Sequence, residues 1–348
     1  MKHIIKRGCF LTLMFMLLGC LSLYAADNDL ITRQITIQLE KAGTLPDRIG
    51  SSRKYTITNL KIIGEINGTD LRMIREMAGS NSTGNSTDGM LSVLDLSEAK
   101  IVEGGDCYYK DHYTSNDVIG SHAFSYCSGL TSLNLPAGIT EIQNDAFRNC
   151  SGLTSLTLPA GITKIGDRAF QGCSGLTSLN LPDGITEIGG GTLAGCSGLT
   201  SLNLPDGITE IGSDAFSGCS GLTSLTLPDG IIWIAPDAFN GCFGLTSIYV
   251  YAEKVPLIGG NAFAGVDVKK CTVYVPMGTR DDYRLSGFGD YFENIVEFEA
   301  TGIDKTTTST EVEEVARYSV NGQRLSAPTK GLNIVKYSDG SVKKVAVQ

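Results

Sequence analysis

Histidine and tryptophan are almost absent from this sequence, which holds three His and one Trp in 348 residues. If residues 1–25 are removed as argued below, only His112 and His122 remain. Catalysis depends on an activated side chain with an oriented partner, and no GxSxG, HExxH or Walker-type glycine loop supplies one. His122 moreover occupies a repeat position that we interpret as solvated. We therefore expect no enzyme, no catalytic residue and no cofactor.

Long apolar runs are also missing, except for one at the N-terminus. A short basic start, MKHIIKRG, precedes the apolar run FLTLMFMLLGCLSLYA, after which the sequence turns polar. This order is typical of a signal peptide over residues 1–25, with cleavage after Ala25 or Ala26. Leu17-Leu18-Gly19-Cys20 also fits a bacterial lipobox, in which case Cys20 would be lipidated. The sequence thus predicts an exported protein and leaves free secretion and lipid anchorage open.

Basic charge is in short supply as well. Without residues 1–25 the chain carries 25 Lys and Arg against 37 Asp and Glu, a net charge near −12, and it has no basic cluster. Such a chain repels phosphate backbones and anionic lipid headgroups. We expect no nucleic-acid partner, and no contact with a membrane except through a lipid anchor at Cys20.

What the sequence has in abundance is repetition. Six cysteines recur every 23 residues, and the stretches between them are nearly identical, as in CSGLTSLNLPAGITEIQNDAFRN. A fixed period of this length indicates a solenoid, in which each unit buries its apolar face only by stacking on its neighbours. The six are Cys127, Cys150, Cys173, Cys196, Cys219 and Cys242.

The residues of one repeat indicate how a coil forms. Leu130, Leu133 and Leu135 alternate with polar residues and predict a short strand with one buried face. Pro136 ends this strand, and Gly138 permits the corner that follows. The apolar residues of two further walls are Ile139, Ile142, Ala146, Phe147 and Cys150.

The repeats belong to a longer organisation. A polar segment rich in Thr follows the last repeat and is typical of a linker, and the alternating segments beyond it predict a small β unit. The predicted parts are a signal peptide at 1–25, an N-terminal segment at 26–56, the solenoid with its caps at 57–298, the linker at 299–314 and the β unit at 315–348.

Two features mark the ends of this organisation. GTDLRMIREMAG, with Leu71, Ile74 and Met77 on one side, predicts an amphipathic helix that covers the first coil. In the final unit, Asn321-Gly322 and Asp339-Gly340 are typical of tight hairpin turns.

The repeated unit LTSLxLPxGITxIGxxAFxGC resembles the BspA-like, or LRR-5, class of bacterial leucine-rich repeats. The opening LKIIGEINGTDLRMIREMAG and the closing CTVYVPMGTRDDYR are similar to the caps of such proteins from Bacteroides-type organisms, so the resemblance covers roughly residues 53–298. It implies a leucine-rich-repeat solenoid, display outside the cell and a binding role. Some members are adhesins for matrix or plasma proteins such as fibronectin. The tail from Arg317 is similar to short C-terminal modules of secreted Bacteroidetes proteins, some of which direct sorting to the surface, but it is shorter than the full sorting domain.

The regular cysteines fit buried thiols better than a metal site or a disulfide ladder. Their constant spacing places them in one column, about 4.8 Å apart in successive coils. Parallel side chains that point into a core are poorly aimed for disulfides, and zinc sites need cysteine pairs a few residues apart. We expect free, buried thiols and no metal. Cys107 and Cys271 lie at opposite ends of the stack, and we do not expect them to pair.

Exposed columns that run across the coils are the candidate binding surfaces. Alternate strand positions carry a nearly uniform row of small polar residues, which includes Asn134, Asn180 and Asn203. This row suits a repetitive partner such as a glycan or an extended peptide, or else it is a solvated sheet face.

Aromatic residues interrupt the columns toward the C-terminal end. Tyr249 and Tyr274 replace Asn and Thr on the strand face, with Tyr251 close by. Trp233 stands, with Ile232 and Leu257 beside it, where earlier repeats carry Thr and Glu or Lys. Exposed aromatic side chains are typical anchors of binding interfaces. The alternative, which we prefer for the Trp233 group, is that it packs under the final coil or the C-terminal unit.

An insertion, DCYYKDHYTSND, provides a third candidate surface through Tyr108, Tyr109 and Tyr113. Loops on a rigid scaffold often carry recognition, although this one can equally fold back over the stack.

These features predict a non-enzymatic, monomeric protein that is secreted or displayed on the outer cell surface. The leading hypothesis is adhesion through an extracellular protein partner. A glycan-binding module and a structural display stalk are the alternatives.

Overall fold

The computed structural model describes residues 30–298, 314–319, 324–325, 331–337 and 342–347. The chain divides into two units, Met1–Glu299 and Ala300–Gln348. The predicted signal peptide with Cys20 lies outside the described residues, and so does nearly all of the predicted linker. Among the described residues, no helix is both long and apolar enough to cross a membrane.

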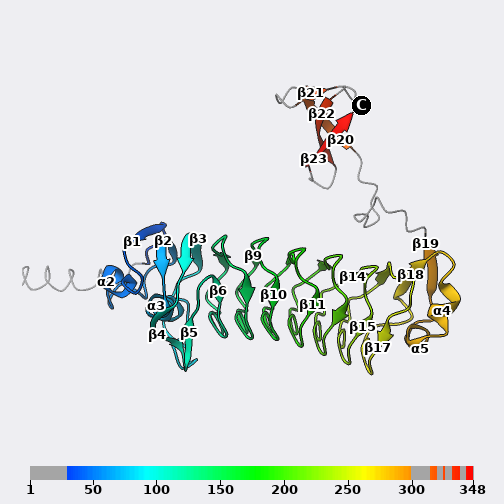
Figure 1. The fold of residues 1–348 in the computed structure, drawn as a ribbon, viewed down its shortest axis with the longest axis horizontal. Coiled ribbons are helices and arrows are strands. Elements are labelled where there is room, and N and C mark those ends of the chain that lie inside the picture. The colour runs from blue at the N-terminus through cyan, green and yellow to red at the C-terminus, as the bar shows by residue number, and fades with distance from the viewer. Residues whose placement is uncertain (1–29, 299–313, 320–323, 326–330, 338–341, 348) are drawn as a thin grey trace, which may run out of the picture. The chain divides into compact units, whose positions relative to one another are not determined.

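The first unit is a row of stacked parallel coils, which confirms the predicted β-rich solenoid (Figure 1). The Leu-Thr-Ser-Leu segment of each repeat forms the first wall, and the pairing register advances by one repeat, so that Leu133 pairs with Leu156. The strands of this wall form two five-stranded sheets. They are β1 (Ile35–Leu39), β2 (Asn59–Ile66), β3 (Val93–Ile101), β7 (Ser132–Asn134) and β9 (Ser155–Thr157), then β12 (Ser201–Asn203), β14 (Ser224–Leu227), β16 (Ser247–Val250), β18 (Thr272–Pro276) and β19 (Ile295–Phe298).

The second wall consists of two-residue strands in which one residue points outward and the next is an isoleucine directed inward. Ile142, for example, is fully buried and pairs with Ile165, whereas Glu141 and Lys164 face out. These strands are β6 (Val118–Ile119), β8 (Glu141–Ile142), β10 (Lys164–Ile165), β11 (Glu187–Ile188), β13 (Glu210–Ile211), β15 (Trp233–Ile234) and β17 (Leu257–Ile258).

The third wall is a series of turns stabilised by backbone hydrogen bonds between coils. The amide of Phe147 donates to the carbonyl of Ala169 over 2.7 Å, and the same bond recurs along the stack. One position in each turn adopts a left-handed backbone with φ between 54° and 62°, which favours Asp, Asn and Gly. It is occupied by His122, Asp145, Arg168, Gly191, Asp214, Asp237 and Asn261.

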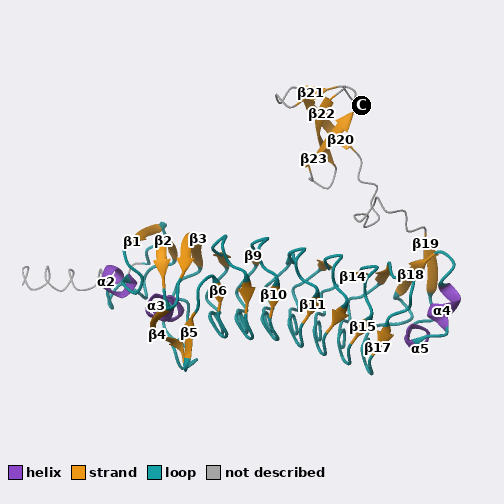
Figure 2. Ribbon diagram, viewed as in Figure 1, coloured by secondary structure: helices purple, strands orange, loops and turns teal. Residues whose placement is uncertain are grey.

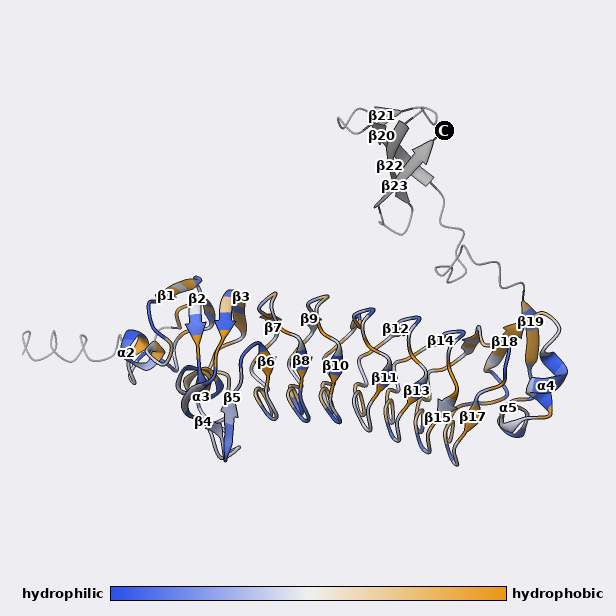
Figure 3. Cartoon of the chain, viewed as in Figure 1, coloured by the Kyte–Doolittle hydropathy of each residue, from blue (hydrophilic) through white to orange (hydrophobic). Residues whose placement is uncertain are grey.

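The core fills the space between the three walls, and apolar residues alternate with polar ones along each coil (Figure 3). Leucine and isoleucine columns run along the stack beside a column of phenylalanines that Leu193 interrupts, and rings such as Phe147 and Phe170 lie parallel with centroids 5.3 Å apart. The column of six cysteines is buried and its thiols are free, as predicted.

Among the described residues, helices lie only at the two ends of the stack (Figure 2). At the N-terminal end, the predicted amphipathic helix is confirmed as α3 (Gly68–Met77), which buries Leu71, Ile74 and Met77. Its first turn is closed by a capping box between Asn67 and Asp70. The helices are α2 (Leu45–Ile49), α3, α4 (Arg280–Arg284) and α5 (Gly287–Tyr291).

The structure differs from the expected start of the solenoid. The first sheet begins at β1, which pairs with β2 in parallel from Ile35↔Leu60 to Leu39↔Gly64, so it extends into the predicted N-terminal segment. The insertion forms a hairpin of β4 (Gly104–Tyr109) and β5 (His112–Thr114).

The second unit contains an antiparallel sheet with the strand order β21-β20-β22-β23. The strands flank the two expected hairpin turns, although both turn dipeptides lie outside the described residues. They are β20 (Glu314–Ser319), β21 (Arg324–Leu325), β22 (Gly331–Tyr337) and β23 (Val342–Val347).

Candidate binding surfaces

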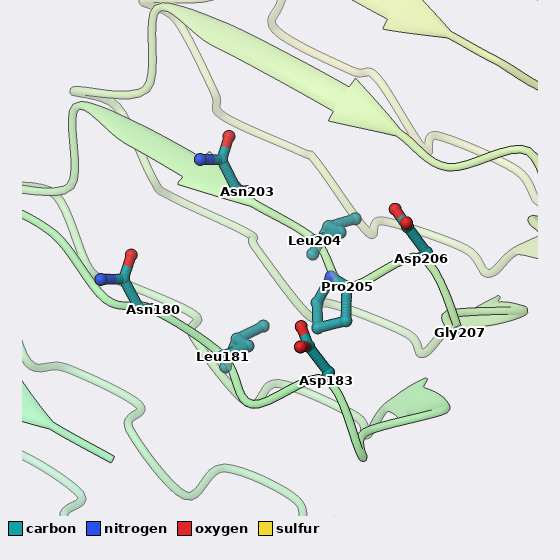
Figure 4. A pocket seen from close by; sticks show the side chains of 8 residues that line it. All are labelled: Asn180, Leu181, Asp183, Asn203, Leu204, Pro205, Asp206 and Gly207. Atoms are coloured by element: carbon teal, nitrogen blue, oxygen red, sulfur yellow. The ribbon is translucent and has the colours of Figure 1, made fainter. Parts of the chain in front are cut away.

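The polar row of the first wall is exposed but not uniform. Asn180 and Asn203 come from adjacent coils and line a hollow of about 430 Å³. In Figure 4 their amides lie parallel on one side of this hollow, and the carboxylates of Asp183 and Asp206 lie on the other. Leu181, Leu204 and Pro205 separate the two pairs. The hollow therefore offers both hydrogen-bond donors and negative charge.

Asn134 is not part of this hollow. It pairs in register with Asp95 of the preceding coil, and the ammonium of Lys61 lies 3.6 Å from the carboxylate of Asp95. Partial burial opposes the ionisation of Asp95, but the hydrogen bonds of Ser97 and the charge of Lys61 hold its pKa below the usual value. The three asparagines of the sequence prediction thus do not form one site.

Aromatic rings gather at the C-terminal end of the first wall. Tyr249 pairs in register with Tyr274, and their rings stack with centroids 4.6 Å apart and planes 8° apart. Phe298 from β19 meets the rings of Tyr249 and Tyr251 edge-on at 6.1 and 5.1 Å. We call these four residues the tyrosine cluster. Partial burial and the neighbouring Tyr274 and Tyr251 raise the pKa of Tyr249, so its hydroxyl stays protonated.

Phe298 was missed by the sequence analysis, although a signal was present. It ends the alternating segment Ile295–Phe298, in which Ile295 is buried, and a strand frame would have placed it at the edge of the first wall. Because the segment lacks the repeat motif, only the pairing of β18 with β19 reveals that it continues the sheet.

Trp233 lies on a different surface from the tyrosine cluster. Trp233 and Leu257 are register partners on the second wall, and Ile232 precedes Trp233. Ile232 is 61% exposed and Leu257 68% exposed, so the final coil does not bury these two side chains. The other form of the preferred interpretation, packing under the C-terminal unit, stays a prediction. Trp233 is half-buried. We call these three residues the apolar patch.

Phe243, like Phe298, is an aromatic residue that the sequence analysis did not single out. It stands where the preceding repeats carry Ser in Cys-Ser-Gly, is 68% exposed, and lies over Gly265. The departure from the repeat motif was the available signal.

The insertion folds back over the stack, which was one of its two interpretations. Tyr108 and Tyr109 are buried, and the guanidinium of Arg75 lies 4.7 Å from the ring centre of Tyr109. Only Tyr113, 59% exposed, remains available to a partner.

His122 is not simply solvated, contrary to the sequence analysis. Its ring stacks on Tyr109 at 4.8 Å and lies 5.2 Å from that of His112. Burial lowers the pKa of His122; Asp145 opposes this shift, while His112 and Arg75 add to it. The hairpin that covers His122 lies outside the repeat, so the repeat position alone could not reveal this burial.

The cysteine thiols act as donors inside the core. The thiol of Cys150 donates to the carbonyl of Phe124 over 2.9 Å, and each later cysteine of the column repeats this contact one coil on. Burial raises the pKa of Cys127 to about 11 and that of Cys173 to about 12. Within the part of the chain that the structure describes, no three His, Cys, Asp or Glu side chains are placed to hold a metal ion.

The parallel coils, the inward leucines and the buried cysteine column define a leucine-rich-repeat solenoid. Residues 112–222 and 171–282 match the model of the BspA type leucine rich repeat region, in six copies. The repeat region of this chain, residues 112–282, belongs to the family of BspA-type leucine-rich repeats.

Several solved structures are similar to this chain. A leucine-rich-repeat protein of T. pallidum is 27% identical, covering 48% of this chain and 75% of its own, with a TM-score of 0.39. One from Bacteroides ovatus is 23% identical, covering 53% and 59%, with a TM-score of 0.37. A leucine-rich cell surface protein of Faecalibacterium prausnitzii is 17% identical, covering 79% and 92%, with a TM-score of 0.26. No curated protein matches the sequence.

Proposed function

We propose that this chain is a non-enzymatic adhesion protein, secreted or displayed on the cell surface, whose tyrosine cluster binds an extracellular protein. The N-terminal sequence pattern and the excess of acidic residues support export and argue against nucleic acid as the partner. The observation that carries the proposal is the tyrosine cluster itself.

The cluster differs from the rest of the first wall in the kind of surface it offers. Most of that wall presents Ser, Thr and Asn, which seldom dominate the energy of an interface. Tyr249, Tyr251 and Tyr274 are each only half-buried. Because the rings pack against one another, they are held in place before a partner binds, and little conformational entropy is lost on binding.

The geometry of the rings favours a protein over a sugar. Tyr249 pairs in register with Thr226 on one side and Tyr274 on the other, and Tyr274 pairs in turn with Val296. The ring faces are therefore directed at neighbouring coils, and the edges and hydroxyls face outward. A pyranose ring stacks on a free aromatic face, whereas protein interfaces use the edges and hydroxyls of tyrosine as well.

The test is binding of the exported protein to immobilised matrix and plasma proteins, fibronectin included. For any protein that binds, Tyr249→Ala with Tyr274→Ala is expected to weaken affinity about tenfold or more, because central aromatic anchors dominate interface energy. Ser155→Ala with Ser178→Ala, on the same wall, is the control and is expected to bind as the native protein does. The melting curve of the double tyrosine variant checks that it is folded. If the folded variant binds as tightly as the native protein does, the tyrosine cluster is excluded as the site.

A glycan remains the second candidate function, favoured by the hollow beside Asn180 and Asn203. Paired amides with carboxylates opposite can hydrogen-bond sugar hydroxyls. Binding on a glycan array that is lost in Asn180→Ala with Asn203→Ala, but kept in the tyrosine variant, would support this candidate over the first. A blank array would count against it.

A further inference from the structure

The outward side of the second wall changes character along the stack. In the early coils Glu141 is paired with Lys164, whose ammonium lies 3.2 Å from its carboxylate. In the next two coils Glu187 and Glu210 are register partners, both exposed, and neither has an ion pair among the described residues. Like charges in directly paired positions repel each other. A cation placed between Glu187 and Glu210 would relieve this repulsion and would therefore be bound favourably.

The corner that precedes the second wall changes at the same point. Ala137 and Ala160 occupy it in the early coils, whereas the later coils carry Asp183, Asp206 and Asp229, all exposed. Together with Glu187 and Glu210, these three aspartates form what we call the acidic stripe.

The apolar patch continues the same outward column. Glu210 pairs with Trp233, and Trp233 pairs with Leu257. Among the described residues of the first unit, Ile232, at 61%, and Leu257, at 68%, stay exposed, and neighbouring exposed apolar side chains of this kind mark interaction sites. Two unpaired negative charges and two apolar anchors therefore follow one another in four successive coils.

We propose that this face of the second wall binds a cationic amphipathic helix of a partner protein. Successive coils are about 4.8 Å apart, and residues three or four apart on a helix rise about 4.5 to 6 Å. A helix lying along the column would therefore place two Lys or Arg side chains against Glu187 and Glu210. Leucine-like residues one and two turns further on would meet Trp233 and Leu257.

Charge and apolar contact act together in this face. The acidic stripe attracts the basic side of the helix and sets its direction, while burial of the apolar patch supplies affinity that salt does not screen. At the far end of the patch Glu253 precedes Lys254, so this loop adds no net charge. The face is independent of the tyrosine cluster, which lies on the first wall.

The test uses a synthetic amphipathic helix of Lys and Leu, with two control peptides: one in which Glu replaces Lys, and one with the same composition scrambled. Tight, saturable binding is expected for the Lys/Leu helix alone. Equal binding of the scrambled peptide would overturn the proposal, because it would show attraction to net charge only.

Two variants of the protein separate the two halves of the face, and both borrow residues that the array itself uses. Ile232→Thr with Trp233→Glu recreates the Ile-Thr-Glu-Ile sequence of sister coils, and Glu187→Lys with Glu210→Lys copies Lys164. Each is expected to weaken binding of the Lys/Leu helix about tenfold. Glu40→Lys with Glu103→Lys makes the same change in net charge elsewhere and is expected to have less effect.

Other outcomes would reject the proposal. Binding that is unchanged in both second-wall variants would place the helix elsewhere. If the native protein is a dimer in solution and Ile232→Thr with Trp233→Glu is a monomer, the face is an interface between two copies of this chain. The variant Tyr249→Ala with Tyr274→Ala is expected to bind the Lys/Leu helix as the native protein does. The proposal of helix binding by the second wall can therefore fail without the proposal for the tyrosine cluster, and the reverse.

Discussion

Single residues in the third wall show how backbone conformation constrains the repeat. The position held by His122 has a left-handed backbone in all seven coils in which it is found, and five of these seven residues are Asp, Asn or Gly. Such residues tolerate this conformation because they lack a bulky β-substituent or bond locally to the backbone. The sequence pattern alone showed a variable polar position, so it suggested solvation and concealed the requirement on φ.

The first prediction concerns His122. Its pKa is lowered in the folded protein, chiefly by burial, so the unfolded chain binds a proton more readily than the folded one. Stability is therefore expected to fall as the pH drops below about 6.5, the ordinary histidine pKa, toward the lowered value. His122→Asn keeps a residue that suits the left-handed backbone, as Asn261 does in its coil, and removes the titration.

The measurement is the melting temperature of both proteins between pH 7.5 and pH 5, in steps around the unfolded pKa. The native protein is expected to lose more stability over this range than His122→Asn. Parallel curves would mean that His122 does not contribute to the pH dependence.

Among the elements, the coil at residues 173–195 is the least regular. The backbone bonds that link it to its neighbours, Thr177 N to Thr154 O and Thr200 N to Thr177 O, measure 3.4 and 3.3 Å, against 2.8 Å between Thr131 and Ser92. Both walls are divided into separate sheets at this coil. Leu193 stands here in the phenylalanine column, so the stack of rings stops at Phe170 and resumes at Phe216.

The second prediction is that Leu193→Phe stabilises the solenoid. The flanking coils stack the rings of Phe216 and Phe239 with centroids 5.0 Å apart, so the column accommodates phenylalanine at consecutive positions. Two new ring contacts are expected to add about 1 kcal/mol to the free energy of unfolding, read from urea denaturation. The reciprocal change, Phe216→Leu, is expected to lower it by about as much. A lower midpoint for Leu193→Phe would show that this coil has closed around the smaller side chain.

The elements also show what the sequence could and could not predict. The strand frame of Leu130, Leu133 and Leu135 and the helix face of Leu71, Ile74 and Met77 were predictable, because periodic burial leaves a periodic pattern. β1 also alternates, but without the repeat motif nothing linked it to β2. Which aromatic residues meet was unpredictable for a similar reason: Tyr249 and Tyr274 follow the repeat, whereas Phe298 joins them through a strand outside it.

At the scale of the whole solenoid, each coil contacts only its neighbours, so stability is close to a sum of similar units. The left-handed glycines that end successive coils, Gly195 and Gly218, have φ of 74° and 73°. Removing residues 196–218 therefore joins Gly195 to Cys219 with the same backbone geometry, and every column keeps its register.

The third prediction is that this one-coil deletion yields a folded protein. It is expected to unfold cooperatively, with the slope of its urea transition reduced by about a tenth, because that slope follows the surface exposed on unfolding. The control removes residues 196–212, which is less than one coil. This deletion shifts the repeat frame, so that leucines which should point inward align with outward polar positions of the neighbouring coil. That variant is expected to lose cooperative unfolding, since a shifted frame leaves core residues in water. If the one-coil deletion also failed to unfold cooperatively, stability would depend on specific coils rather than on their stacking, and the nearest-neighbour account of this fold would be rejected.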